Sequence, residues 1–161
     1  MWKNGTFILE GDGIILLSEG LADRKFFTKL VEHHALPKMD FPWPVEDHEE
    51  ASEDTKKFHG KSSFVNMVKA LAILVKGYPD LGKKIKCVAI GTDAGSDRAR
   101  SFRCVRSQIE NAGNFPIPDE VLEVKASANG FPAVVVMLIP IKGLGGLETL
   151  CVEAFIGKRD G

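Results

Sequence analysis

Short apolar runs separated by amphipathic stretches set the pattern of this chain. The runs at 13–18, 85–90 and 133–139 are rich in Ile and Val and contain few polar residues. Such continuous runs are typical of parallel or mixed strands that are buried on both faces. Two weaker runs, at 7–10 and 121–125, predict additional strands.

Between these runs, apolar residues recur at helical spacing in 26–34, 64–75 and 102–112, with a shorter stretch in 147–155. Strands that alternate with helices predict an α/β fold. The segment from about 37 to 61 breaks the pattern, because it begins with three prolines and continues with six acids and no base in "EDHEEASED". It predicts a solvated loop inserted into a single domain that spans residues 1–161.

Composition adds limits on the class of protein. The net charge of −1 over 161 residues excludes a strongly basic nucleic-acid binder, although a local basic patch stays open. Three scattered cysteines predict reduced thiols rather than a disulfide framework. The chain begins without the apolar stretch of a signal peptide, and no apolar run reaches the roughly 18 residues of a membrane span. We therefore expect a cytoplasmic protein that does not enter membranes.

Acidic residues follow the ends of the strongest strands. Glu19 ends the first, Asp93 ends the second with Asp97 four residues on, and Glu148 comes after the third and a glycine-rich loop. The carboxyl ends of parallel strands meet at one edge of a sheet, where ligands gather. Together with Asp23, these carboxylates would form an oxygen-rich site for a hard divalent cation.

Each acid also has a structural explanation. Asp23 and Glu148 suit the first turn of a helix, where they interact with the helix dipole, and Asp97 suits an N-cap. Glu19 stands out because a strand-to-helix turn needs no glutamate. Asp93 stands out similarly, although aspartate often forms local turns at strand ends. Both readings stay open from the residues alone.

Two of these segments resemble a known family. "LLSEGLADRKFF" at 16–27 resembles the first motif of the TOPRIM (topoisomerase–primase) fold, where an apolar strand ends on Glu-Gly. "VAIGTDAGSDR" at 88–98 resembles the second motif, where a strand ends in Asp-x-Asp. With the loop "PIKGLGGLETLC" and the overall length, the chain resembles an uncharacterised TOPRIM-like family related to the nuclease domain of OLD (overcoming lysogenisation defect) proteins, over residues 13 to about 155.

The resemblance implies a TOPRIM-like three-layer sandwich, with a mostly parallel central sheet of about four strands flanked by helices. It also implies Mg²⁺ (or Mn²⁺) as the cofactor and phosphodiester chemistry as the activity. By position, Glu19 is a metal ligand or general acid–base, Asp93 is the main metal ligand, and Asp23 is an additional acid. Glu148 and Lys142 correspond to a later acid and a later base.

The chain departs from the TOPRIM pattern in its second motif. The second aspartate of Asp-x-Asp is replaced by Gly95. Asp97, two residues further on, would substitute as a metal ligand only if the loop turned its carboxylate inward. Otherwise the site would lose a ligand and with it activity.

Basic residues could meet a phosphate backbone beside these acids. Arg98, Arg100 and Arg103 lie at the start of the third helix, and with Lys142 they are candidate nucleic-acid contacts. A solvated helix face explains the arginines equally well. "HGKSS" at 59–63 is not expected to be a P-loop, because it lacks the earlier glycine and the strand that feeds one.

Three functions therefore stay open. The first is a divalent-metal-dependent nuclease of phage defence or DNA repair, acting on DNA or RNA as a homodimer or with a partner ATPase. The second is a catalytically degenerate TOPRIM scaffold that binds a nucleic acid or a protein. The third is a small nucleotide- or metabolite-binding protein. The resembling family commonly continues beyond the point where this sequence stops.

Overall fold

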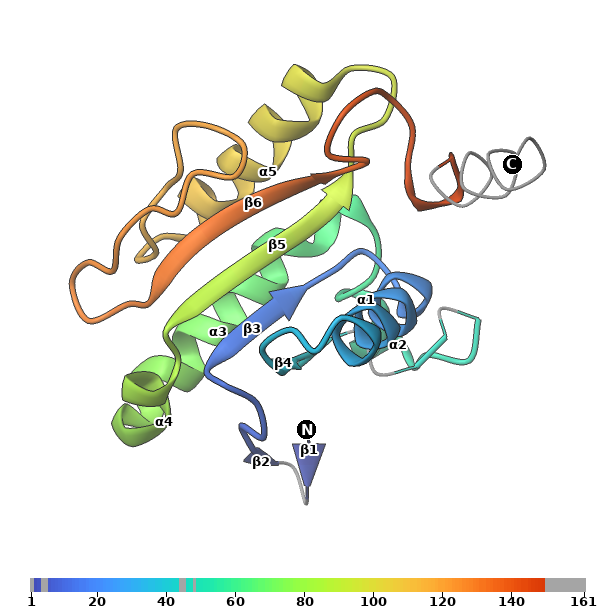
Figure 1. Ribbon diagram of the computed structural model, residues 1–161. Helices are drawn as coiled ribbons and strands as arrows, with labels where there is room; N and C mark the ends of the chain where they lie inside the picture. The colour runs from blue at the N-terminus through green and yellow to red at the C-terminus, as the bar shows by residue number, and fades with distance from the viewer. Residues whose placement is uncertain (1, 4–5, 44–45, 48, 150–161) are drawn as a thin grey trace.

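The computed structural model describes residues 2–3, 6–43, 46–47 and 49–149 (Figure 1). Its centre is a four-stranded, all-parallel sheet in the order β4-β3-β5-β6. The strands are β3 (Ile14–Leu17), β4 (Met39–Asp40), β5 (Cys87–Asp93) and β6 (Ala133–Ile139). The predicted α/β fold with a parallel sheet of four strands is confirmed.

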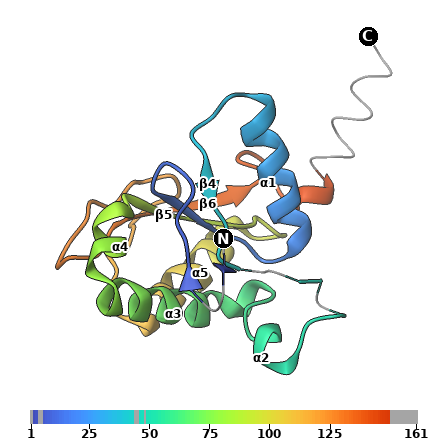
Figure 2. The ribbon, with the colours of Figure 1, turned by 90° about the horizontal axis from the view of Figure 1, so that it is seen from below.

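Helices cover both faces of the sheet. Figure 2 shows α1 (Leu21–His33) on one side and α3 (Phe64–Gly77) with α5 (Arg98–Ala112) on the other. Successive side chains of a strand point to opposite faces, so β3 feeds both cores. Ile15 and Leu17 pack with α3 and α5, whereas Leu16 packs with Phe27 of α1.

The larger core lies on the side of α3 and α5. Phe64, Met67 and Leu71 of α3 are completely buried there, beside Val105 of α5 and Val136 of β6. Complete burial of a large apolar side chain stabilises a fold by roughly 1.5–3 kcal/mol. The helical spacing that predicted α3 and α5 is the spacing of their buried positions, whereas in α1 only Phe27 is buried.

Two of the weaker strand predictions need correction. Val121–Lys125 is not a strand: Leu122 has φ +65°, and only Lys125 forms a bridge, with Val134 at the edge of β6. Of the predicted strand at 7–10, only Phe7 lies in a strand. That strand, β2 (Thr6–Phe7), pairs antiparallel with β1 (Trp2–Lys3), outside the main sheet.

The segment 37–61 is anchored at several points. It contributes the edge strand β4, whose buried Asp40 accepts hydrogen bonds from the backbone of Glu10 and Gly11. Trp43 is buried and stacks on Phe58, with ring centroids 4.9 Å apart. The segment also includes α2 (Glu53–Lys56). Its six acids at 46–54 are exposed.

Short elements complete the described chain. A 3₁₀ turn, η1 (Lys61–Ser63), leads into α3, and α4 (Pro79–Lys84) comes after α3. Residues 147–149 are helical, and the rest of the predicted helix at 147–155 lies outside the described residues. Within the part of the chain that the structure describes, no helix is long and apolar enough to span a membrane.

The parallel sheet decides where the loops meet. The arrowheads of β3, β5 and β6 point to the same end of the molecule (Figure 1). The connections that leave these strands, at 18–20, 94–97 and 140–146, therefore begin at one edge. This edge carries the acids that the sequence singles out.

Candidate functional site

Glu19 is tied to the end of the neighbouring strand. Its Oε1 accepts a hydrogen bond from the backbone N–H of Asp93 at 3.0 Å and another from the hydroxyl of Thr92. Its backbone carbonyl accepts from the N–H of Gly60 at 2.7 Å. The carboxylate that follows β3 is thus fixed against the tip of β5.

Asp23 lies in the first turn of α1 and bonds back to its start. Its Oδ2 accepts from the N–H of Gly20 at 2.9 Å, which satisfies one of the free donors at the helix end. Burial raises the pKa of Asp23 to about 6, against the lowering effect of that hydrogen bond. The carboxylates of Asp93, Glu19 and Glu148 add to the rise. The acid is therefore both a helix-capping group and a member of a cluster.

Asp93, the last residue of β5, is enclosed by the loop that follows β6. Its Oδ1 accepts from the N–H of Leu147 at 3.2 Å. A Cβ added to Gly146 would lie only 2.6 Å from the carboxyl carbon of Asp93, so a larger residue there would displace the aspartate or the loop. Burial raises the pKa of Asp93, and Glu19 and Glu148 raise it further, whereas the Leu147 hydrogen bond and Lys61 lower it.

Four carboxylates from three stretches of chain thus act on one another. We call Glu19, Asp23, Asp93 and Glu148 the acid cluster. Glu148 is exposed at its rim. Within the described residues, none of the four forms an ion pair with Lys, Arg or His. Burial is the main reason why the two aspartate pKa values rise, and the neighbouring like charges, which disfavour the ionised state, add to it.

Asp97 takes a different position from the one a metal ligand would need. Its Oδ1 accepts from the N–H of Arg100 at 2.9 Å and caps α5, and its charge is not among those that shift the pKa of Asp23 or Asp93. Gly95 has φ +62° and exchanges two backbone hydrogen bonds with Gly145, at 2.6 and 2.8 Å. The structure therefore does not bring Asp97 into the acid cluster.

The basic candidates divide into two kinds. Arg98 donates from its guanidinium to the carbonyls of Pro140, Ile141 and Gly143, at 2.6, 2.7 and 2.9 Å. It holds the loop that encloses Asp93. The other three candidates, Arg100, Arg103 and Lys142, are exposed.

Lys61 is a site residue that the sequence did not indicate. Its Nζ donates to the carbonyl of Asp93 at 2.7 Å and to the hydroxyl of Ser101 at 2.8 Å. Gln108 of α5 accepts from the N–H of Val65 and donates to the carbonyl of Lys61, which fixes the start of α3. No local pattern around Lys61 encodes this contact, because its partners are about 30 to 50 residues away in sequence.

The chemistry of the acid cluster suits a hard divalent cation, because its donors are all carboxylate oxygens and, among the described residues, none of them forms an ion pair. In the described part of the chain, no group of three or more His, Cys, Asp or Glu side chains is arranged to hold a metal ion. The donor types fit Mg²⁺ or Mn²⁺, and Glu19, Asp23, Asp93 and Glu148 are the residues that would hold it.

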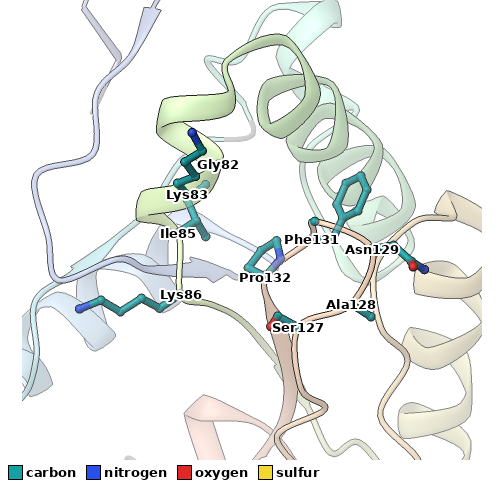
Figure 3. Close-up of a pocket in the computed structure, with 10 residues that line it drawn as sticks. Gly82, Lys83, Ile85, Lys86, Ser127, Ala128, Asn129, Phe131 and Pro132 are labelled. Atoms are coloured by element: carbon teal, nitrogen blue, oxygen red, sulfur yellow. The ribbon is translucent and has the colours of Figure 1, made fainter.

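A separate cavity of about 320 Å³ lies at the opposite end of the sheet. Figure 3 shows Lys83 and Lys86 on one side of it and Ser127 and Asn129 on the other. It is close to the first residues of β5 and β6, and it shares no residue with the acid cluster.

Comparisons with protein-family models, with curated proteins and with solved structures gave no match to this chain. Its function is accordingly inferred from the residues and their arrangement.

Proposed function

We propose that the protein is a divalent-metal-dependent enzyme that processes phosphodiester bonds, with a TOPRIM-type acid cluster as its active site. The observation that carries the proposal is a cluster of four acids, without an ion pair among the described residues, at the carboxyl edge of a parallel sheet. A structural cluster would include its own cations, whereas a metal site supplies its charge from outside.

The residues have separate roles in this proposal. Asp93, fixed by the N–H of Leu147, and Glu19, fixed by Thr92 and the N–H of Asp93, are the oriented ligands. Glu148 and Asp23 complete the oxygen donor set. When bound, Mg²⁺ would polarise a phosphoryl oxygen and lower the pKa of a water molecule.

Asp23 and three exposed basic residues are suited to handle protons and the substrate. Without a bound metal, Asp23 has a pKa of about 6, so its carboxyl group changes protonation close to neutral pH and can exchange a proton before the metal binds. Lys142 is exposed in the loop that encloses Asp93, where its ammonium group would face a bound phosphodiester. Arg100 and Arg103, on the exposed side of α5, would contact the backbone of DNA or RNA.

Cleavage of labelled single- and double-stranded DNA and RNA tests the proposal. We expect cleavage with Mg²⁺ or Mn²⁺, none with EDTA, and none with Asp93→Asn, which keeps the shape of the side chain. Asp119→Asn is the matched control, because Asp119 is an exposed acid outside the cluster. Absence of cleavage by the wild type with either metal, or equal loss in both variants, would contradict the proposal.

A second function is favoured by the loop after β5. Gly95 stands where the second aspartate of Asp-x-Asp would be, and Asp97 caps α5 instead of joining the acids. A scaffold that binds a nucleic acid without cutting it fits these two facts. Binding of a polynucleotide that is unaffected by EDTA, without cleavage under any metal condition, would establish it in place of the enzyme.

A further inference from the structure

We infer that a cavity beside the acid cluster, between η1 and the start of α5, binds a backbone phosphate of a polynucleotide next to the one that is processed. The cavity measures about 280 Å³, and its lining includes Lys61, Gly95, Ser96, Arg100 and Ser101. None of the four clustered acids lines it. The identity of the anion rests on the proposed function; the capacity to bind an anion does not.

The first support is the charge that faces this cavity. Lys61 and Arg100 come from different segments, η1 and α5, and both line it. Within the described residues neither forms an ion pair with an acid. Two cations that form no ion pair among the described residues thus line a cavity next to the acid cluster, and the charge of Lys61 also acts on Asp93. A polyanion that reaches both regions would compensate the cations directly and the acids through a bound metal.

The second support is that the ammonium group of Lys61 is held in place. It donates to the carbonyl of Asp93 and to Ser101, whose hydroxyl in turn donates to the carbonyl of Ala94. An ammonium has three donors, so one is left for a ligand. Holding the charge before the ligand arrives reduces the entropy that binding costs.

The third support is the small residue at the floor of the cavity. A Cβ added to Gly95 would lie 3.5 Å from the Ser101 hydroxyl and 4.0 Å from the Lys61 ammonium. Gly95 therefore leaves the ammonium accessible from the cavity. This gives a reason for the glycine that replaces the second aspartate: an aspartate at position 95 would bring a negative charge to the same place.

One lining group opposes an anion. Asp97 also lines the cavity, and its Oδ1 accepts a hydrogen bond from the N–H of Arg100. Removal of its charge should therefore strengthen anion binding. Asn is an equally good N-cap, so Asp97→Asn changes the charge and keeps the start of α5.

The test measures anisotropy of fluorescein-labelled oligothymidylate with the full chain in EDTA, so that no metal contributes. We expect Arg100→Ala and Ser96→Asp to weaken binding and Asp97→Asn to strengthen it. Loss of one phosphate contact should reduce the slope of log affinity against log salt by about 0.7. Lys69→Met, on the exposed side of α3, is the matched control and should bind like the wild type.

Lys61→Met should lose more affinity than Arg100→Ala. Because Lys61 also bonds to Asp93 and Ser101, this variant counts only if its circular dichroism matches the wild type. Competition distinguishes the source of the anion: a dinucleotide with two phosphates should displace the probe, whereas inorganic phosphate at equal concentration should not.

If Arg100→Ala and Ser96→Asp both bound with the affinity and salt slope of the wild type, the inference would be overturned. Weaker binding by Asp97→Asn would also overturn it. Equal displacement by inorganic phosphate would overturn the assignment to a polynucleotide. The proposed enzymatic function is tested separately by Asp93→Asn. If it is correct, this variant should lose metal-dependent cleavage and still bind the oligonucleotide in EDTA. Binding with the expected variant pattern but without cleavage therefore supports the phosphate site and contradicts the enzyme.

Discussion

The pKa values of two groups of acids in this protein shift in opposite directions from their ordinary values. On the surface after α5, Asp119 lies 2.6 Å from the ammonium of Lys125 and 3.1 Å from the guanidinium of Arg106. A hydrogen bond from Lys125 and its charge lower the pKa of Asp119. The pKa of Glu123 is also lowered, mainly by the N–H of Asp119. At the edge of the sheet, in contrast, the pKa values of Asp23 and Asp93 are raised.

The difference contrasts a surface group that has its own counter-charges and stabilises the fold with an acid cluster that we propose binds a cation. The surface group includes Lys125 within six residues of Asp119, so the local chain supplies the counter-charge. The acid cluster collects carboxylates from positions as distant as 19 and 148, and none of them has a cationic partner within the described residues. Acids held together at a cost in stability are often functional, and a bound cation is the explanation that we propose.

The largest effect is expected from Gly146→Ala. Its Cβ would lie 2.6 Å from the carboxyl carbon of Asp93, so the aspartate or the loop must move. Displacing groups that orient a ligand typically costs 10–100-fold in metal affinity, and we expect roughly that loss for Mn²⁺. Gly77→Ala is the control, because a Cβ there meets no atom within 4 Å. Unchanged Mn²⁺ affinity in Gly146→Ala would show that Asp93 does not bind the ion.

Next comes Arg98→Ala, which removes three hydrogen bonds from the loop that encloses Asp93. We expect the free energy of unfolding to fall by about 2 kcal/mol, the usual effect of losing hydrogen bonds to a charged group. Urea unfolding measures it. Arg103→Ala, on the same helix and exposed, should change it by less than about 0.5 kcal/mol. Equal effects would mean that Arg98 does not hold the loop.

A smaller effect is expected from Asp23→Asn, and its sign depends on pH. The folded protein holds a proton on Asp23 up to a pKa of about 6, above the ordinary value of 3.8. Ionisation of Asp23 therefore reduces stability as pH rises from about 4 to 6. Asn keeps an oxygen that can accept the hydrogen bond from the N–H of Gly20, and its side chain cannot ionise. The variant should therefore gain stability relative to the wild type at pH 7.5 but not at pH 3.5. A constant difference across this range, measured by urea unfolding, would contradict the raised pKa.

The smallest effect is expected from Lys125→Met in the surface group. The lowered pKa values of Asp119 and Glu123 mean that their ionised forms stabilise the fold above the ordinary acid pKa, and that this contribution is lost as pH falls. The variant should therefore melt slightly below the wild type at pH 7, with the difference vanishing in acid or at high salt. Thermal melts at two salt concentrations measure this. A difference that persists at high salt would indicate lost packing instead.

The sequence was sufficient to predict the elements that have a regular pattern of apolar residues. The Ile- and Val-rich runs predicted β3, β5 and β6, and helical spacing predicted α1, α3 and α5. It missed β4, because two residues carry no period and Asp40 is polar although it is buried. It also predicted a strand at 121–125, where φ +65° at Leu122 turns the chain.

The candidate site could be predicted only in part. Strand ends identified Glu19 and Asp93, because a parallel sheet brings such ends together. Asp97 is an N-cap in the structure, which was one of the two readings that its position allowed. Lys61 and Arg98 form their hydrogen bonds with residues more than 30 positions away in the sequence, in the case of Arg98 with the carbonyls of the 140–143 loop. No local pattern could therefore indicate these contacts.

Calorimetric titration with Mn²⁺ at pH 7.5 tests most directly whether the acid cluster is kept for a cation. The wild type and Asp119→Asn should bind saturably and alike, whereas Asp93→Asn should lose at least about 10-fold in affinity, as expected when a ligand or its support is removed. Wild-type binding should weaken at pH 5.5, because protons then compete at Asp23. No saturable binding by the wild type, or equal losses in Asp119→Asn and Asp93→Asn, would contradict the account.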